Sequence, residues 1–283
     1  MRGKTIAVNI NKGGTGKTTS VCSISQVLAL CNYKVLLIDV TEQKDSTRMF
    51  GMEKYQEKVC FEDLLTDDVE KENIMSMITE TPFKNLYMIP ATQELKSIGD
   101  MLHLIEMKYS EPELLVCLKD NLWKIKDEFD YILFDSDPGM NRLNKEILVA
   151  ADEVIASVQT DAFSASAIAS QNEIINRLNN LCNTNTRLKA VYCTQVNCKT
   201  NIVKQFREEL KKELGTMYID TPISNCSKVV ESNALLVPLF QYAPKCKAAK
   251  EYIALVISLG WVDREHYTYI RETYKDIFDR ENQ

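Results

Sequence analysis

The sequence predicts an α/β fold, a doubly wound and mostly parallel sheet with helices on both faces. Two observations predict it. Short apolar runs recur along the chain with the pattern of buried strands, and the segments between them carry apolar residues at three- and four-residue intervals, which is typical of helices. Buried strands that alternate with helices favour a parallel sheet covered on both sides. With 283 residues, 45% hydrophobic and 26% charged, the chain suits one such domain.

The first strand is expected at residues 4–10, ahead of a glycine cluster and a helix that begins near Lys17. Further strands are expected at 34–39, 86–89, 131–134, 154–158 and 188–193, and helical patterns occur at 111–128, 163–181 and 200–213. No Pro/Gly/Ser-rich linker divides them. We therefore expect residues 1–260 to form one domain and residues 261–283 to form a C-terminal tail helix, packed on that domain or extending from it.

Composition limits the classes of function. No window of about 18 apolar residues occurs, so we expect no membrane association. Nine cysteines without a paired Cys-x-x-Cys motif argue against a disulfide framework and favour the cytoplasm. The net charge of −6 argues against a globally basic nucleic-acid binder. Residues 187–250 nevertheless hold eleven Lys/Arg against five Asp/Glu, a local basic region that could meet DNA.

The segment between the first strand and the first helix has the composition of a phosphate-binding loop. Its glycines allow backbone N–H groups to turn inward, and the dipole of the following helix favours an anion at the same place. Lys17 would reach the β- and γ-phosphates of ATP, and the Thr18 hydroxyl would bind Mg²⁺. The expected nucleotide-binding residues of this loop are Asn11, Lys12, Gly13, Gly14, Thr15, Gly16, Lys17, Thr18 and Thr19.

The loop departs from the usual pattern at its start, where Asn11 replaces the leading glycine and a second lysine, Lys12, follows. Here the sequence resembles the ParA/MinD-type deviant Walker-A ATPases, and among them the ParA (Soj-like) partition ATPases most. The resemblance runs over residues 4–259. In that family the early lysine crosses a dimer interface to the partner's phosphates, so the resemblance implies an ATP-sandwich homodimer with Lys12 acting in trans. A lysine that cannot fold back onto its own phosphate needs such a partner.

Two acidic positions follow predicted strands. Asp135 ends an apolar run in the layout of a Walker-B strand, and we expect it to hold Mg²⁺ through water. Asp39 ends the second strand, but Thr41 stands where ParA proteins usually carry the aspartate that positions the attacking water. A threonine hydroxyl can orient a water but cannot accept its proton at neutral pH. Asp39, Glu42 and Asp45 are alternative sources of the missing carboxylate.

We therefore expect a weak ATPase, which converts ATP and water to ADP and phosphate, and in which ATP binding is a firmer expectation than hydrolysis. Its expected catalytic residues are Lys12, Lys17, Asp39 and Thr41, and its expected metal-binding residues are Thr18 and Asp135.

The resemblance also implies a base-covering segment and a DNA surface. Residues 242–245 look like the ParA stretch that covers the nucleotide base, and Asn225 and Pro244 are expected to contribute to the nucleotide site. Lys199 and Lys228 stand at two positions where ParA proteins carry DNA-binding arginines. Lysine keeps the charge but loses bidentate phosphate geometry, so contacts with DNA should be weaker and more sensitive to salt.

Other branches of the family fit less well. An iron–sulfur reductase needs cysteine ligands, and residues 136–140 contain none. The tail mixes acidic and basic residues instead of forming a basic membrane-binding helix. The related tyrosine kinases lack the early lysine.

The sequence thus favours a bacterial ParA-like ATPase that dimerises with ATP, binds nonspecific DNA on the nucleoid, has a ParB-like partner and acts in plasmid or chromosome partition. Thr41 motivates the alternative, a hydrolysis-deficient ATP-binding adaptor that holds a protein partner.

Overall fold

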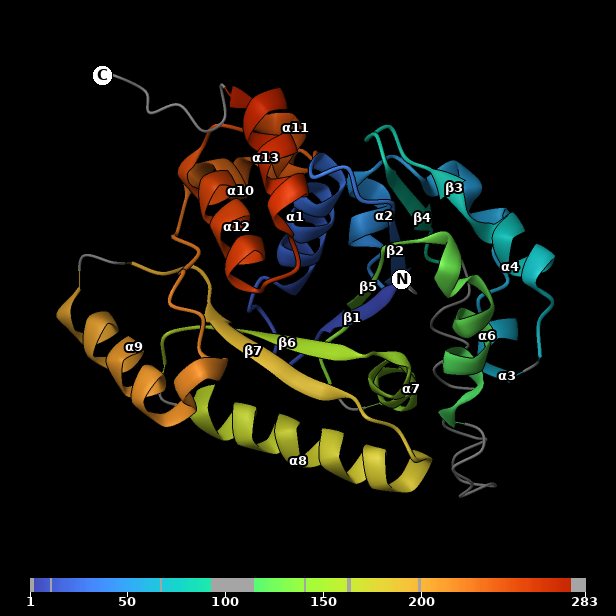
Figure 1. Ribbon diagram of the computed structural model, residues 1–283, viewed down its shortest axis with the longest axis horizontal. Helices are drawn as coiled ribbons and strands as arrows, with labels where there is room; N and C mark the ends of the chain where they lie inside the picture. The colour runs from blue at the N-terminus through green and yellow to red at the C-terminus, as the bar shows by residue number, and fades with distance from the viewer. Residues whose placement is uncertain are drawn as a thin grey trace.

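The computed structural model describes residues 3–10, 12–66, 68–92, 115–139, 141–161, 164–197 and 200–275. Within them lies a seven-stranded sheet of order β3-β4-β2-β5-β1-β6-β7 (Figure 1). Its strands are β1 Lys4–Val8, β2 Val35–Val40, β3 Thr79–Glu80, β4 Leu86–Ile89, β5 Tyr131–Ser136, β6 Glu153–Val158 and β7 Arg187–Cys193. All neighbouring strands pair in parallel except β3 with β4. The doubly wound α/β prediction is confirmed.

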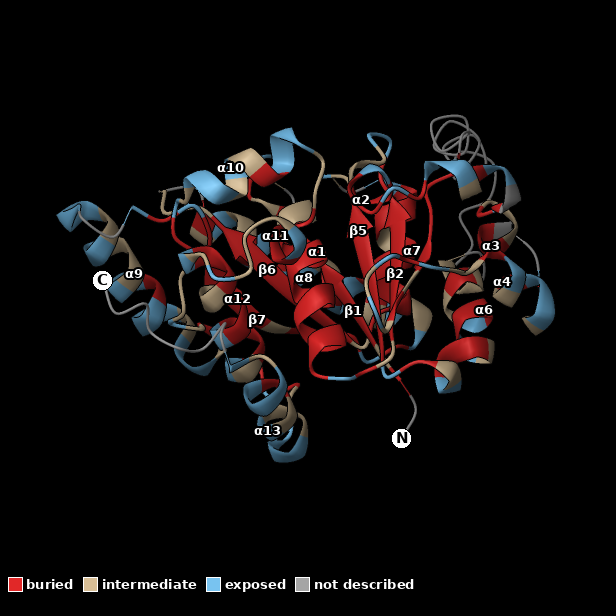
Figure 2. Cartoon of the chain, turned by 90° about the horizontal axis from the view of Figure 1, so that it is seen from above, coloured by how far each residue is buried: buried red, intermediate tan, exposed pale blue. Residues whose placement is uncertain are grey.

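Two layers of helices cover the sheet. One face carries α3 Asp63–Thr66, α4 Lys71–Met77, α6 Cys117–Ile125, α7 Arg142–Ala150, α8 Ser164–Cys182 and α9 Asn201–Leu214. The other carries α1 Lys17–Leu30, α2 Asp45–Met49, α10 Ser227–Ala234, α11 Leu239–Tyr242, α12 Lys247–Ser258 and α13 Arg264–Thr273. Short 3₁₀ turns are η1 Glu53–Lys58, η3 Lys126–Glu128 and η4 Gly215–Met217. Figure 2 shows the central strands and α1 as buried, because each has neighbours on every side.

The predicted helical patterns correspond to real helices where the structure describes them. The pattern at 163–181 is α8, and that at 200–213 is α9. The pattern at 111–128 becomes α6 and η3, while residues 111–114 lie outside the described part. Strand β3 was not expected, because two residues of Thr-Glu sequence carry no apolar alternation.

The described part of the tail packs against the α1 side of the sheet. Trp261 is buried; its backbone carbonyl accepts a hydrogen bond from the Tyr131 hydroxyl, and its Nε1 donates to Glu153 at 2.8 Å. The Tyr33 ring stacks on His266 with centroids 3.9 Å apart. Ile270, on α13, is also fully buried. Residues 276–283 lie outside the described part.

None of the helices in the described ranges combines the length and the apolar character needed to cross a membrane.

A buried ion pair on α7 predicts a dependence of stability on pH. Arg142 Nε donates to Glu146 Oε1 at 2.9 Å, and Glu146 Oε2 has no partner among the described residues. Burial raises the pKa of Glu146 to about 7, against the opposing effect of Arg142. The folded state therefore keeps a proton that the unfolded chain releases, and stability should fall as pH rises from about 4.5 to 7, by on the order of 3 kcal/mol.

Urea unfolding of the wild type and of Glu146→Gln at pH 5 and pH 7 checks this prediction. The neutral amide keeps an acceptor for Arg142, so the variant should lose this part of the pH dependence. Identical pH dependence in the two proteins would contradict the assignment to Glu146.

Candidate functional site

A pocket of about 250 Å³ opens at the carboxyl ends of β1, β2 and β5. It is lined by residues 14–19, by Thr41, Gln43 and Asp45, and by residues 136–138. In open parallel sheets ligands bind at this edge, because the loops that leave the strands meet there. The expected phosphate loop, the end of β2 and the end of β5 are thus brought together.

The phosphate loop takes a backbone form that requires glycine. Gly14 and Gly16 have φ of 72° and 75°, in the left-handed region that other residues adopt at a cost. The Gly14 carbonyl accepts hydrogen bonds from Gln159 Nε2 at 3.0 Å and from Gln195 Nε2 at 2.8 Å. Two glutamines that follow β6 and β7 therefore hold the loop in place, and local sequence pattern carries no signal for these contacts.

Thr15 is held from the same side. Ser157 Oγ donates to its hydroxyl at 3.2 Å, and Thr194 Oγ1 donates to its carbonyl at 2.7 Å. Asn11 lies outside the described residues.

Lys17, the first residue of α1, is 6% exposed. Its Nζ donates to the Lys12 carbonyl at 3.0 Å. Burial lowers the pKa of Lys17, and this effect outweighs the charges of Asp135 and Asp137, which raise it. A buried ammonium group at a helix N-terminus, paired by hydrogen bond only with a neutral carbonyl among the described residues, suits an anionic ligand.

Asp135 ends β5 beside Thr18, whose Oγ1 donates to Asp135 Oδ1 at 3.0 Å. The carboxylate is fully buried. Among the described residues, neither its Oδ2 nor the Ser46 hydroxyl makes a hydrogen bond of good geometry, but the Ser46 hydroxyl lies close enough to lower the pKa of Asp135. Burial, together with the charge of Asp39, raises the pKa of Asp135 well above its usual value.

This arrangement fits Mg²⁺ with phosphate. An unpaired buried carboxylate oxygen next to a threonine hydroxyl is a suitable oxygen donor set. Among the described residues no group of three or more His, Cys, Asp or Glu side chains could hold a metal ion, so phosphate oxygens and water would have to complete the coordination.

Asp39 anchors the segment that follows β2. Its Oδ1 accepts from the Thr41 amide at 3.0 Å and the Thr41 hydroxyl at 2.7 Å; its Oδ2 accepts from the Thr47 amide at 2.8 Å and the Thr47 hydroxyl at 2.7 Å. The Thr41 hydroxyl also accepts from the Lys44 amide at 3.0 Å. The Thr41 proton thus points at Asp39, and both carboxylate oxygens of Asp39 are engaged by protein donors.

The alternative carboxylates lie differently. Glu42 is exposed, and its amide donates to Asp137 Oδ2 at 2.7 Å. Asp45 and Asp137 both line the pocket, and burial is the main cause that raises the pKa of each. A carboxylate with a raised pKa in a cleft is a candidate proton acceptor. The structure therefore places Asp45 and Asp137 at the pocket as carboxylates that could act on a water.

Lys12 is not among the residues that line the phosphate pocket. Its ammonium group forms an ion pair and a hydrogen bond with Asp161, in the turn that precedes α8. Asp161 also accepts from the Ser164 hydroxyl at 3.3 Å. Asp161 could not be predicted from the sequence, because it is 149 positions from Lys12 along the chain.

Helix α10 reaches the mouth of the site. Asn233 Nδ2 donates to the Thr19 hydroxyl at 3.1 Å, so Asn233 joins the expected nucleotide-binding residues in space. Asn225 lies just before α10, and its amide donates to the Val196 carbonyl at 3.1 Å, beyond the end of β7.

Pro244 is not among the residues that line the phosphate pocket. It lines a separate cavity of about 410 Å³ together with Ala29 and Leu30, at the C-terminal end of α1. The phosphate loop is at the N-terminal end of this 14-residue helix, roughly 20 Å away at the usual helical rise.

The two lysines of the expected DNA surface are only partly described. Lys199 lies outside the described residues. Lys228, on α10, is exposed; its Nζ contacts Glu231 Oε2 at 2.8 Å and lies 5.7 Å from the centroid of the Tyr242 ring. Its charge is thus partly offset by a neighbour on the same helix.

Known proteins that resemble this chain include partition ATPases. A family model described as an AAA domain matches residues 3–190. Sporulation initiation inhibitor protein Soj of Bacillus subtilis is 30% identical over 253 residues, which cover 89% of this chain and 96% of that protein. Chromosome-partitioning ATPase Soj of Treponema pallidum is 28% identical over 250 residues, which cover 88% and 94%.

Among solved structures, a Cyanothece McdA variant in complex with ATP aligns with a TM-score of 0.75 at 20% identity, and the alignment covers 92% of this chain and 97% of that one. Identity at this level shows a shared fold.

Proposed function

This chain belongs to the ParA/MinD-type deviant Walker-A ATPases. From that premise we propose that it is a ParA-like ATPase that dimerises on binding ATP and binds DNA without sequence specificity. We propose that it acts in plasmid or chromosome partition with a ParB-like partner. One observation carries the proposal. The two lysines of the loop differ in surroundings: Lys17 is buried and lines the phosphate pocket, whereas Lys12 does not line it and forms an ion pair with Asp161. Lys12 is free to reach a second subunit once Asp161 releases it.

The residues divide the work of the proposed site. Lys17 and the N–H groups of the loop bind the phosphates, while Thr18 and Asp135 hold Mg²⁺. When bound, Mg²⁺ would offset the negative charge of the phosphates and of the buried carboxylates. Asp137 and Asp45 line the pocket and supply carboxylates for the attacking water. Lys12 leaves Asp161 when the dimer forms and then contacts the phosphates of the ATP bound to the second subunit, where its positive charge stabilises their negative charge.

Sedimentation of the purified protein without nucleotide, with ADP and with ATP–Mg²⁺ tests the proposal, with phosphate release measured in the ATP sample. We expect a dimer with ATP alone and slow release of phosphate. A monomer under all three conditions would refute the role of Lys12 in trans.

Nonspecific DNA binding predicts an effect of charge reversal at Lys228. Phosphate contacts depend on charge, so Lys228→Glu should lower retention on DNA at low salt severalfold and reduce the salt dependence by about one unit of slope. Lys84→Glu, an exposed lysine in the turn before β4, is the matched control and should bind DNA as the wild type does. Equal retention of all three proteins would remove Lys228 from the DNA surface; Lys199→Glu extends the test to the second lysine.

A second candidate function, the hydrolysis-deficient adaptor, is favoured by the contact between Thr41 and Asp39. The Thr41 hydroxyl donates to Asp39 at 2.7 Å, so it offers no proton acceptor to a water. Thr41→Asp should therefore raise phosphate release at saturating ATP–Mg²⁺ if the ATPase proposal is correct. The added carboxylate lies against Asp39, so the nucleotide-free variant should melt a few degrees lower, by about 1 kcal/mol of like-charge repulsion.

Thr41→Asn is the matched control, because asparagine has the shape of the introduced aspartate without its charge. This variant should leave phosphate release unchanged. Retained ATP binding with no gain in release for Thr41→Asp would favour the adaptor.

A further inference from the structure

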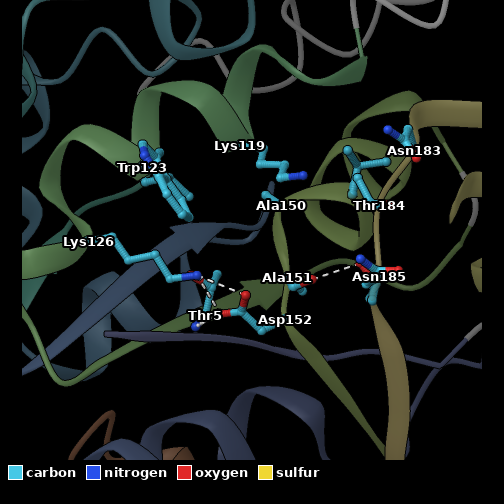
Figure 3. Close-up of a pocket in the computed structure, with 13 residues that line it drawn as sticks. Thr5, Lys119, Trp123, Lys126, Ala150, Ala151, Asp152, Asn183, Thr184 and Asn185 are labelled. Atoms are coloured by element: carbon cyan, nitrogen blue, oxygen red, sulfur yellow. Dashed lines mark hydrogen bonds and ion pairs between the residues drawn. The ribbon is translucent and has the colours of Figure 1, made fainter. Parts of the chain in front are cut away.

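A third cavity lies at the end of the sheet opposite the phosphate loop. Its volume is about 230 Å³, and it is bounded by α6 and η3 on one side and by the segment between α8 and β7 on the other. Figure 3 shows Trp123 and Lys126 facing Asn183, Thr184 and Asn185 across it, with Lys119 pointing into the space between them. The floor includes Thr5, near the start of β1. The nucleotide pocket follows the other end of β1, so the two sites do not overlap.

The cavity carries one unneutralised positive charge. Lys126 Nζ contacts both carboxylate oxygens of Asp152, at 2.6 and 2.8 Å, and the Thr5 amide donates to the same carboxylate at 2.7 Å. Lys126 and Asp152 thus neutralise each other. Lys119 is half-buried and makes no hydrogen bond or ion pair with any residue that the structure describes. An ammonium group without a counter-charge favours an anion in its vicinity.

One wall of the cavity is aromatic. Trp123 is 51% exposed, whereas the chain's other tryptophan, Trp261, is 3% exposed. Lys126 Nζ lies 5.6 Å from the centroid of the indole ring, and the exposed part of the ring offers an apolar surface to another ring. Opposite it, the side chains of Asn183 and Asn185 carry amide groups that can donate hydrogen bonds. An aromatic wall, a cation and amide donors that converge on one small space are the features of a specific ligand site.

We propose that this cavity binds a small aromatic carboxylate, with its ring against Trp123 and its carboxylate on Lys119 and the amide groups of Asn183 and Asn185. The volume is below the range of sites for drug-sized molecules, which begins at about 300 Å³, and so it selects a single ring. The same chemistry is carried by a free metabolite and by the C-terminal aromatic residue of a peptide. The site requires no nucleotide, so it stands independently of the proposed ATPase function.

Titration of the wild-type chain with phenylacetate, followed by tryptophan fluorescence and by ligand-observed NMR, tests the proposal. Trp123 is the exposed reporter, and Trp261 supplies a constant background. We expect saturable binding in the millimolar range or tighter. Phenylacetamide, with the ring but no charge, and cyclohexylacetate, with the charge but no aromatic ring, should each bind at least about fivefold more weakly.

Variants of Lys119 locate the binding. Lys119→Gln should weaken phenylacetate binding at least about fivefold, and Lys119→Arg should restore it, because the charge returns. Lys212→Gln, an exposed lysine on α9, is the matched control and should bind as the wild type does. Thermal melts of all variants report whether each is folded.

The peptide Gly-Gly-Phe and its C-terminal amide distinguish the two sources of ligand. Tighter binding of the free-acid peptide than of phenylacetate assigns the site to a peptide C-terminus, and the reverse order assigns it to a free small molecule. No saturable signal up to about 10 mM of either probe, a range that corresponds to negligible affinity, would overturn the proposal. Equal binding by the wild type and a folded Lys119→Gln would also overturn it.

Discussion

Replacing Lys17 with alanine is expected to abolish ATP binding by this chain. Lys17 lies in the phosphate pocket, 6% exposed, and its Nζ is held by a neutral carbonyl. Each charge-assisted hydrogen bond to a phosphate is worth about 1.5–3 kcal/mol. Lys17 is expected to reach both the β- and the γ-phosphate, so removal of the ammonium group should cost about 3–6 kcal/mol and weaken ATP binding by at least about 100-fold. Calorimetric titration with ATP–Mg²⁺ measures the change.

Lys12→Ala is the matched control for this prediction. Lys12 belongs to the same loop, but its side chain faces Asp161 instead of the pocket. The variant should therefore bind ATP as a monomer with nearly wild-type affinity and fail to form the ATP-dependent dimer in sedimentation. Wild-type ATP binding by Lys17→Ala would contradict the assignment of the pocket.

Lys17→Ala is not expected to destabilise the fold when no nucleotide is bound. Burial lowers the pKa of Lys17, which means that the folded state is less favourable for its charged form than water is. Lys17→Ala should then leave the melting temperature without nucleotide unchanged or higher. A side chain that costs stability and binds ligand is typical of a functional site.

Replacing Asp39 with alanine is expected to cause the largest loss of stability, about 3–5 kcal/mol. The carboxylate is 1% exposed and accepts four hydrogen bonds, from the amides and hydroxyls of Thr41 and Thr47. Without it, buried donors in both residues lose their partner. The Thr47 hydroxyl also accepts from the Ala91 amide at 2.9 Å, so the damage should spread toward the end of β4. Urea unfolding measures the change in free energy.

Asp39→Asn is the control, because its amide keeps one acceptor oxygen and the shape of the side chain. It should lose less stability than Asp39→Ala does. The two variants should also lower the pKa of Asp135, since the charge of Asp39 helps to raise it. A loss of less than about 1 kcal/mol in Asp39→Ala would show that the four contacts contribute little.

Much of the fold could be predicted from local pattern. Strands β1, β2, β4, β5, β6 and β7 lie where apolar runs predicted them. Such runs are diagnostic because a parallel strand covered by helices is buried on both faces, as all six residues of β2 are. The edge strand β3 lacks that burial and so lacks the signal. The glycine pattern of the loop was equally readable, since the positive φ of Gly14 and Gly16 constrains residue type directly.

The partners within the site could not be predicted in the same way. Lys12 with Asp161, Thr19 with Asn233, and the Gly14 carbonyl with Gln195 join positions 149, 214 and 181 apart in sequence. Each contact depends on how the loops after β6 and β7, and the helix α10, lie beside the phosphate loop. Pro244 illustrates the same point, because its place along α1 depends on the path of the chain after α10.

Sequence alone was therefore sufficient to predict the buried strands, the phosphate loop and the family. Burial on two faces and the backbone conformation of the loop restrict which residue types can stand at consecutive positions, so both are visible as local patterns. The tertiary structure alone decided that Lys12 turns to Asp161, that Asp39 engages its oxygens with Thr41 and Thr47, and that Lys119 and Trp123 share a cavity. Side-chain contacts between distant elements depend on packing geometry, and a single sequence carries no local pattern for that geometry.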